Sequence, residues 1–312
     1  MSRRLVYFNG DFVPEQEARI SIFDCALMYG DMAFEMTRSF GQRPYRLREH
    51  LERLYASLRY AEIDCGLSLD QMEEATHRTI ERNLPALDGL DFQIMHDVTR
   101  GALPLYDTLV QEGTRPIVTI NVFPLVRHTG GMAPKYEEGA HFVITPQQSV
   151  PARYLDPKAK TRSRLHYKVA ELQAAHMEKG AMALLTDEHG FITEGTGNNF
   201  FMVRHGELLT PKPRDILRGV SRGACLELAA RLGLRAHETD IEPYDVRQAE
   251  EAWCTSTTIC MLPITRFNFQ PVADGKPGPV YRQLLAAWSA EVGLDIPAQA
   301  RQYAELAKTW KP

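Results

Sequence analysis

The sequence predicts a mixed α/β protein built from two domains. Its 312 residues exceed the roughly 250–300 residues that one hydrophobic core usually organises. Strand-like and helix-like segments alternate in both halves, and the stretch HTGGMAPKYEEG, with three glycines and a proline, separates them. We therefore expect a small N-terminal α/β domain over residues 1–125, an interdomain linker over 126–138 and a larger C-terminal domain over 139–312.

Composition excludes several classes of protein. A hydrophobic content of 44% and a charged content of 24% are typical of a soluble protein, and a net charge of −4 argues against a nucleic-acid-binding surface. The apolar runs fall far short of the roughly 20 residues that span a membrane. Five scattered cysteines without a C-x-x-C motif suit a reducing cytoplasm. The ten histidines show no metal-ligand spacing, so we expect no metal site.

The N-terminal half reads as strands followed by two helices and two more strands. Leu5–Phe8 forms a strand closed by an Asn-Gly turn. In REHLERLYASLRYAEI, apolar residues recur at helical spacing. The remaining expected elements are strands near residue 20 and over 32–40, a helix over 70–83, and strands over 92–101 and 116–125.

The C-terminal half alternates more strongly. Ser221 is a candidate N-cap for the helix SRGACLELAARLG, and Gly233 follows its end. The other expected elements are a helix over 164–179, paired strands over 182–187 and 191–195, a hairpin centred on 205–206, a strand-turn-strand over 249–267 and a closing helix over 281–292.

The stretch FITEGTGNNFF, residues 191–201, places one acid in a strand-like apolar segment. Glu194 could lie at the exposed tip of an ordinary hairpin. Alternatively it faces inward and requires a partner, because an unpaired buried carboxylate is unfavourable. That partner could be an arginine, a lysine or the protonated ring nitrogen of a cofactor.

Two further features favour a cofactor. Lys160 lies just before a helix, 34 residues ahead of Glu194. Two stretches are suited to binding phosphate: LRGVSRG, at a helix N-terminus where free N–H groups attract anions, and CTSTT, which offers hydroxyl donors after a strand. Each stretch alone is a weak signal, because Gly-x-Ser before a helix is usually only a cap.

Taken together, these motifs resemble a known family. From Tyr7 to beyond Ile296 the chain is similar to the class IV, or fold-type IV, pyridoxal-phosphate aminotransferases. This group includes branched-chain and D-amino-acid aminotransferases, (R)-amine transaminases and aminodeoxychorismate lyase. The matching stretches are YFNGDFV, MYGDMAFEMTRSF, REHLERL, AKTRSRL, TDEHGFITEGTGNNFF, LLTPKPRDILRGVSRG and CTSTTICMLPI. The resemblance implies the two-domain fold of D-amino-acid aminotransferase and pyridoxal 5′-phosphate as cofactor.

The resemblance also implies roles for individual residues. Lys160 would form the Schiff base with the cofactor and move the proton between the substrate α-carbon and C4′. Its rivals are Lys158, out of register with the family pattern, and Lys168, whose helical position favours a solvated side chain. Glu194 would keep the pyridine nitrogen protonated. The other implied cofactor-binding residues are Arg53, Asn199, Val220, Ser221, Ser256 and Thr257. For Arg53, a surface ion pair with Glu49 is the alternative.

The substrate pocket is less clearly marked. The candidates are Tyr29, Phe34, Arg38, Arg100 and Thr258, with the two arginines as possible carboxylate clamps. Leu105 and Asp107 occupy the positions of the Arg-x-His pair of D-amino-acid enzymes, which argues against that branch. Leu165 replaces the tyrosine of branched-chain enzymes, so the subfamily stays open.

The expected function is transfer of an amino group between an amino acid, of branched-chain type or a related primary amine, and a 2-oxo acid. An aminodeoxychorismate-type lyase that releases pyruvate is the alternative, and a non-catalytic relative is a third. The resemblance implies a homodimer with the active site at the subunit interface. The apolar loop that contains Leu103, Leu105 and Tyr106 is consistent with this assembly.

Overall fold

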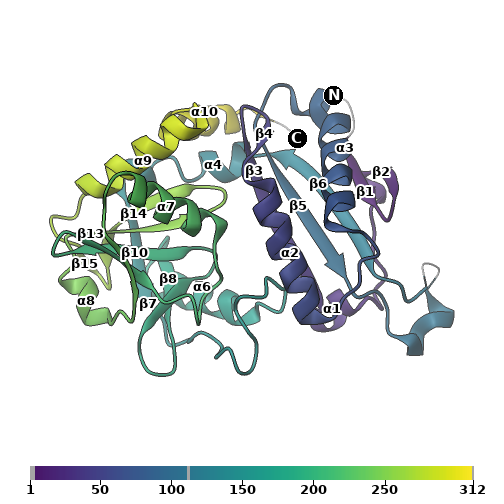
Figure 1. Cartoon of the computed structure of the whole chain (residues 1–312), viewed down its shortest axis with the longest axis horizontal. Coiled ribbons are helices and arrows are strands. Elements are labelled where there is room, and N and C mark those ends of the chain that lie inside the picture. Colours follow the sequence, from purple (N-terminus) through teal and green to yellow (C-terminus); the bar gives the residue numbers. More distant parts are fainter. Residues whose placement is uncertain (1–3, 111–112, 311–312) are drawn as a thin grey trace. The chain divides into compact units, whose positions relative to one another are not determined.

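The structure, a computed structural model, describes residues 4–110 and 113–310 (Figure 1). By its internal contacts the chain divides into two units. Unit 1 comprises residues 1–125 and 159–164, and unit 2 comprises residues 126–158 and 165–312. Each unit combines a β-sheet with helices, which confirms the mixed α/β class.

Unit 1 is built on an antiparallel sheet with strand order β2-β1-β6-β5-β3-β4. The strands are β1 (Leu5–Phe8), β2 (Asp11–Pro14), β3 (Met32–Phe40), β4 (Arg43–Pro44), β5 (Phe92–Thr99) and β6 (Ile117–Pro124). The strand expected near residue 20 is wrong, since residues 18–20 have no regular structure.

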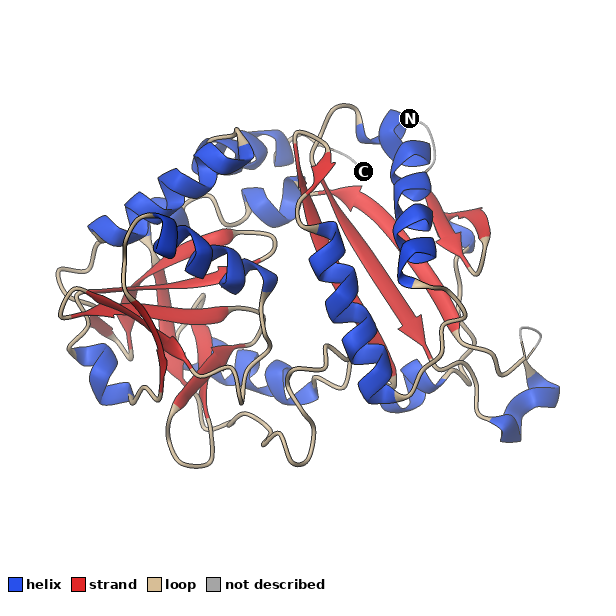
Figure 2. Cartoon of the chain, in the orientation of Figure 1, coloured by secondary structure: helices blue, strands red, loops and turns tan. Residues whose placement is uncertain are grey.

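Helices α2 (Leu47–Ala61) and α3 (Leu69–Leu87) lie over one face of this sheet (Figure 2). In α2 the buried residues Leu51, Leu54 and Leu58 follow the predicted helical spacing and join the core under the sheet. Helix α3 begins one residue earlier than predicted because Ser68 caps it through a capping box with Gln71. Unit 1 also contains α1 (Cys25–Tyr29) and the short helices η1 (Glu15–Glu17) and η2 (Pro104–Leu109).

The segment over residues 159–164 belongs to unit 1 because it pairs with the edge of β3. The Phe34 N–H donates to the Lys160 carbonyl (3.0 Å), and the Arg162 N–H donates to the Met32 carbonyl (3.1 Å). An isolated bridge between Ala33 and Thr161 lies between these bonds. The backbone of Lys160 is thereby fixed on β3.

Unit 2 contains a second sheet, with strand order β12-β11-β10-β13-β14-β7-β8-β9. Because β9 also pairs with β10, the sheet closes on itself. The strands are β7 (Ala140–Ile144), β8 (Met182–Thr186), β9 (Ile192–Gly195), β10 (Asn199–Arg204), β11 (Glu207–Pro211), β12 (Ala236–Thr239), β13 (Glu251–Ser256), β14 (Cys260–Phe267) and β15 (Gln270–Pro271). The predicted pairing of β8 with β9, the hairpin β10–β11 and the strand-turn-strand β13–β14 are confirmed.

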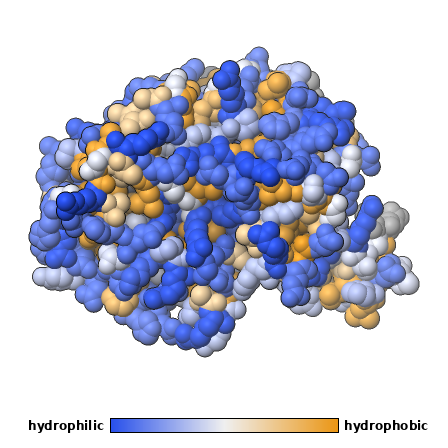
Figure 3. All heavy atoms as spheres, viewed as in Figure 1, coloured by the Kyte–Doolittle hydropathy of each residue, from blue (hydrophilic) through white to orange (hydrophobic). Residues whose placement is uncertain are grey.

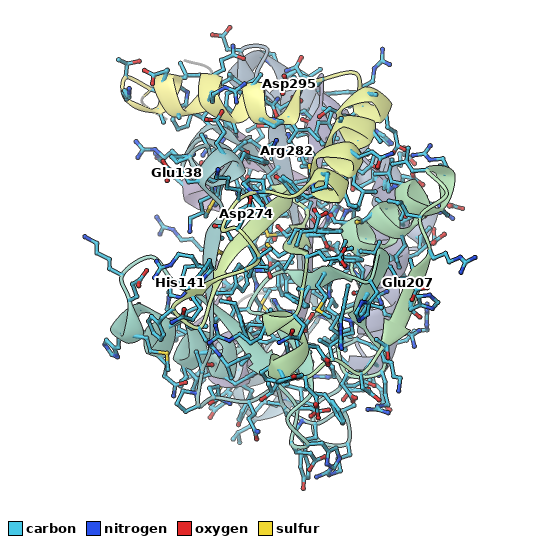
Figure 4. The ribbon with its side chains drawn as sticks, turned by 90° about the vertical axis from the view of Figure 1, so that its left-hand side faces the viewer. Glu138, His141, Glu207, Asp274, Arg282 and Asp295 are labelled. Carbon is cyan, nitrogen blue, oxygen red and sulfur yellow. The ribbon has the colours of Figure 1, made fainter. Side chains whose placement is uncertain are left out.

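The helices of unit 2 are α4 (Val126–Gly130), α5 (Lys135–Glu138), α6 (Leu165–Met177), α7 (Val220–Arg231), α8 (Pro243–Arg247), α9 (Pro279–Val292) and α10 (Ile296–Ala307). The sequence predicted α9 as the closing helix, which is wrong. Asp295 caps a further helix, α10, by accepting a hydrogen bond from the Ala298 N–H (Figure 4). No described helix is both long and apolar enough to cross a bilayer.

Residues 126–138, expected as a linker, carry α4 and α5. A Cβ added at Gly130 would come within 2.7 Å of the Tyr303 backbone, so α4 and α10 pack with their backbones in close approach.

Candidate active site

Glu194 lies inside β9 and is 4% exposed. Its Oε1 accepts a hydrogen bond from the Tyr167 hydroxyl (2.7 Å). Its Oε2 accepts bonds from Asn199 Nδ2 and from the Leu217 backbone N–H, both at 3.1 Å. Of the two alternatives left by the sequence, the structure therefore shows the buried acid, and the hairpin tip falls at residues 196–198.

Tyr167 was not predicted from the sequence. It lies in α6 and is buried with Ala170 and Ala174, three and seven residues further on. A tyrosine within such a buried stripe needs a partner for its hydroxyl, and this was the available signal. Leu165, two residues earlier, is 77% exposed.

Asn199 connects Glu194 to the start of α7. Besides its bond to Glu194, its Nδ2 donates to the Leu217 carbonyl (2.9 Å). A Cβ added at Gly219 would lie 2.1 Å from Asn199 Oδ1. The backbone therefore passes so close to the Asn199 side-chain amide that only glycine fits at this position. One side chain thus fixes both the carboxylate and the approach to the helix.

The first turn of α7 is suited to an anion. Gly219 is its N-cap and supplies no side-chain hydrogen bond, so the predicted cap Ser221 is wrong: it is the second residue of the helix, after Val220. A side chain at Gly219 is excluded by Asn199, which explains why the cap is a glycine. The first N–H groups of the helix and its dipole then favour negative charge.

The turn after β13 lies beside the same residues. Asn199 pairs with Thr255 across the sheet, and β13 ends at Ser256. Thr257 and Thr258 follow in the turn to β14. Thr255 Oγ1 is buried without a hydrogen-bond partner among the described atoms. Asn199 thus contacts Glu194 and the loop before α7 and pairs with Thr255, next to Ser256. That Val220, Ser221, Ser256, Thr257 and Thr258 form one site with Glu194 stays a prediction.

Within unit 1, Lys160 lies beside an aromatic ring. Its Nζ is 4.7 Å from the centre of the Phe34 ring, and Arg162 Cζ is 3.7 Å from that centre. The two rivals have other partners: Lys158 pairs with Asp156, and Lys168 pairs with Glu171 at the surface. The catalytic role of Lys160 remains a prediction from the resemblance.

Arg53 belongs to a buried ionic cluster. Its Nε and Nη2 donate to the two oxygens of Glu35 on β3, at 2.8 and 2.7 Å. Its partner is therefore Glu35, whereas Glu49 pairs with Arg46. Burial alone would raise the pKa of Glu35, but the charge of Arg53 beside it and the neighbouring His50 hold that pKa well below its usual range.

Two histidines complete this cluster. His50 Nδ1 lies 3.1 Å from Glu35 Oε1, and burial lowers the pKa of His50. His96, opposite Glu35 in the sheet, is fully buried, and burial lowers its pKa to about 4. Thr76 Oγ1 donates to the Met72 carbonyl, so it accepts a bond from Nε2–H of a neutral His96 at 2.8 Å.

The two arginines proposed as carboxylate clamps have structural partners. Arg38 is buried over Phe40 and donates to the Ser39 carbonyl. Arg100 binds Asp31 and the carbonyls of Ala61 and Glu62 at the end of α2. A clamp role for either stays a prediction, and these contacts favour a role in holding unit 1 together. Tyr29 is exposed at the end of α1.

Comparison with known proteins decides the family. Residues 32–267 match the family described as amino-transferase class IV. The chain belongs to the class IV aminotransferases. It is a pyridoxal-phosphate-dependent aminotransferase, and the lyase alternative is not favoured.

Relatives and solved structures agree. A provisionally named branched-chain-amino-acid aminotransferase of Methanocaldococcus jannaschii is 30% identical over 89% of this chain and 93% of its own. The D-alanine aminotransferase of Bacillus licheniformis is 28% identical over 90% and 95%. A solved branched-chain amino acid aminotransferase from T.th., complexed with N-(5′-phosphopyridoxyl)-L-glutamate, is 25% identical with a TM-score of 0.81 over 98% and 97% of the two chains.

The residues of unit 2 fit this cofactor. An oriented carboxylate suits a protonated pyridine nitrogen. A helix N-terminus without a side-chain cap, close to hydroxyl side chains, suits a phosphate. In the described residues, no group of three or more histidine, cysteine or acidic side chains is placed to hold a metal ion.

We predict that Gly219→Ala weakens cofactor binding. The added methyl group collides with Asn199 Oδ1 and displaces the first turn of α7. We expect the overpacking penalty of about 1–3 kcal/mol to appear as a loss of roughly five- to 150-fold in cofactor affinity. Absorbance titration of the apoenzyme with pyridoxal phosphate measures the effect. Gly223→Ala is the matched control, since its Cβ meets nothing within 4 Å in the same helix. Equal affinity of the Gly219 variant and the wild type would contradict the geometry.

We also predict that acid destabilises the enzyme partly through His96. Its pKa is about 4 in the folded protein and about 6.5 in the unfolded chain, so the unfolded state takes up the proton first. The contribution of His96 to the free energy of unfolding is therefore fully present above about pH 6.5. It falls by roughly 3 kcal/mol as the pH drops towards 4. His50 contributes in the same direction. In urea denaturation at several pH values, the free energy of unfolding should decline less steeply with falling pH for His96→Gln than for the wild type. If both proteins lose stability in parallel, His96 is not the responsible group.

Proposed function

We propose that the enzyme transfers the amino group of a branched-chain-type amino acid, or a related primary amine, to a 2-oxo acid. The observation that carries the proposal is the buried carboxylate of Glu194, oriented by Tyr167, Asn199 and Leu217. Branched-chain aminotransferases among the relatives support the substrate class. Phe34, beside Lys160, remains the candidate for contact with the substrate side chain that the resemblance implies.

Each site residue has a defined task in this proposal. When bound, pyridoxal phosphate supplies the electron sink for the pair of electrons left at the substrate α-carbon. Lys160 Nζ would hold the cofactor covalently, and the same nitrogen would carry the proton between the substrate α-carbon and C4′. Glu194 keeps a proton on the pyridine nitrogen, and its three donors prevent the carboxylate from turning away.

Val220, Ser221, Ser256 and Thr257 of unit 2 would hold the phosphate, and the family resemblance assigns Arg53 of unit 1 to the same group. The backbone N–H groups at the start of α7 and the hydroxyls after β13 act as donors, while Arg53 supplies charge. Tyr29, Phe34 and Thr258 are the candidates for contact with the substrate.

The decisive experiment compares an amino donor alone with donor plus acceptor. With leucine alone we expect one equivalent of 2-oxo acid per site, and continued turnover only after a 2-oxo acid acceptor is added. Continuous release of pyruvate from aminodeoxychorismate without an acceptor would instead indicate a lyase, because the enolpyruvyl group of that substrate supplies the pyruvate. Lys160→Ala should abolish product, and borohydride reduction should leave it without a covalent cofactor adduct detectable by mass. Lys168→Ala is the control and should retain both.

We further propose a symmetric homodimer that covers an apolar surface of unit 1. Exposed side chains of residues 22–29, which include α1, and of η2 form this surface, part of which is seen at the lower right of Figure 3. A stack of Phe23 on Tyr106, with ring centres 4.8 Å apart, joins the two segments. The exposed members are Ile22, Leu27, Tyr29, Leu105 and Leu109. So much exposed apolar surface favours a partner, and two-fold symmetry is the commonest arrangement.

We predict that Leu105→Glu weakens this dimer, because a charge would be buried on assembly. Light scattering should give twice the chain mass of 35.4 kDa for the wild type and a lower average mass for the variant. Tyr244→Glu, at an exposed aromatic on α8, is the control and should leave the mass unchanged. A fully active wild-type monomer would overturn the proposal.

A cytoplasmic location is proposed as well. All five cysteines are free thiols, and four of them are buried. Burial raises the pKa of Cys225 and of Cys254 to about 12, so neither forms a thiolate readily. Free cysteines of this kind are typical of proteins in a reducing compartment.

A further inference from the structure

We propose that Glu35 is a positioning residue for cofactor binding: it fixes the guanidinium of Arg53 in the orientation that receives the phosphate. This inference rests on the proposed phosphate role of Arg53. Neither residue was linked to the other by the sequence, because Glu35 lies on β3 and Arg53 on α2, 18 residues apart.

The contact between them fixes an orientation. Arg53 uses Nε and Nη2 to bind both oxygens of Glu35, at 2.8 and 2.7 Å. A planar guanidinium held by two parallel bonds along one edge can neither rotate about its axis nor tilt. The arginine side chain is 11% exposed, so its plane is set by the protein rather than by solvent.

Glu35 is itself held in place. Its Oε1 accepts a bond from the Met36 backbone N–H at 2.8 Å and lies 3.1 Å from His50 Nδ1. The carboxylate is completely buried within the sheet face that α2 covers. A rigid strand therefore provides the reference to which the arginine is aligned.

The same turn of α2 is tied to Lys160. Ser57 Oγ donates to the Arg53 carbonyl at 2.9 Å and accepts the Lys160 backbone N–H, also at 2.9 Å. The arginine and the lysine are thus attached to one helical turn. A displacement of Arg53 would alter the relation between the two groups through which unit 1 would hold the cofactor.

The inference is testable because an effect of charge and an effect of positioning would change phosphate binding in opposite directions when Glu35 is neutralised. Glu35 cancels the charge of Arg53, so its neutralisation would strengthen attraction for a phosphate if charge alone mattered. If Glu35 acts by positioning, its neutralisation weakens phosphate binding. A buried ion pair is in any case a poor source of stability, which favours a role in geometry.

The experiment compares two ligands of the apoenzyme: pyridoxal phosphate and pyridoxal, which lacks the phosphate. For Glu35→Gln we expect the preference for pyridoxal phosphate to fall about tenfold or more, with the affinity for pyridoxal within about twofold of wild type. Asp91→Asn is the matched control. Asp91 is a buried carboxylate of the same unit that accepts bonds from Ser39 and the loop after β3, and this variant should keep the preference.

Two further variants separate the possible failures. If Arg53→Gln keeps the wild-type preference, the phosphate role of Arg53 is wrong and the inference falls with it. If Arg53→Gln loses the preference while Glu35→Gln keeps or increases it, only the positioning role is wrong. Glu35→Asp retains the charge on a shorter side chain and serves if the glutamine variant does not fold. It should lose part of the preference, and an unchanged preference in a folded Glu35→Asp would also overturn the inference.

Discussion

The arrangement of unit 2 depends on the hydrogen bonds around the Glu194 carboxylate. Its strand β9 is the element that closes the sheet, and the closing pair is Glu194 with Asn199. A carboxylate at such a position must be satisfied, because burial without partners is unfavourable by several kcal/mol. The three donors come from α6, from β10 and from the loop before α7. Satisfying one buried acid therefore fixes the mutual position of three separate segments.

In unit 1, strand β3 likewise holds two separate segments in place. One edge of β3 binds the backbone on both sides of Thr161, and its helix-facing side carries Glu35. The strand thus positions Lys160 through backbone hydrogen bonds and Arg53 through a side chain. Two residues that we propose as cofactor ligands, far apart in the sequence, are thus positioned by one rigid strand.

The sequence predicted the elements better than the contacts between them. Periodicity located α2, and turn residues located the hairpins, because both signals are local. Helix α10 was missed although Asp295 and the following proline mark its start. The N-cap of α7 was misplaced by two residues, since the reason for Gly219 is a collision with Asn199, a residue of another element.

The arginines and glutamates show why the site could be predicted only in part. Arg38, Arg53 and Arg100 look alike in the sequence, and only the structure shows which distant residues each one contacts. Two of the buried glutamates, Glu35 and Glu194, illustrate the same point. Glu35 faces a cation, so its charge is largely cancelled within unit 1.

Glu194 is oriented by a hydroxyl, an amide and a backbone N–H, which are neutral groups. Neutral donors fix the direction of a carboxylate and stabilise its charged form without cancelling the charge. A carboxylate oriented in this way suits the protonated ring nitrogen that we propose as its partner in the bound cofactor. The three donors come from segments far apart in the sequence, and no pattern along the chain records these contacts.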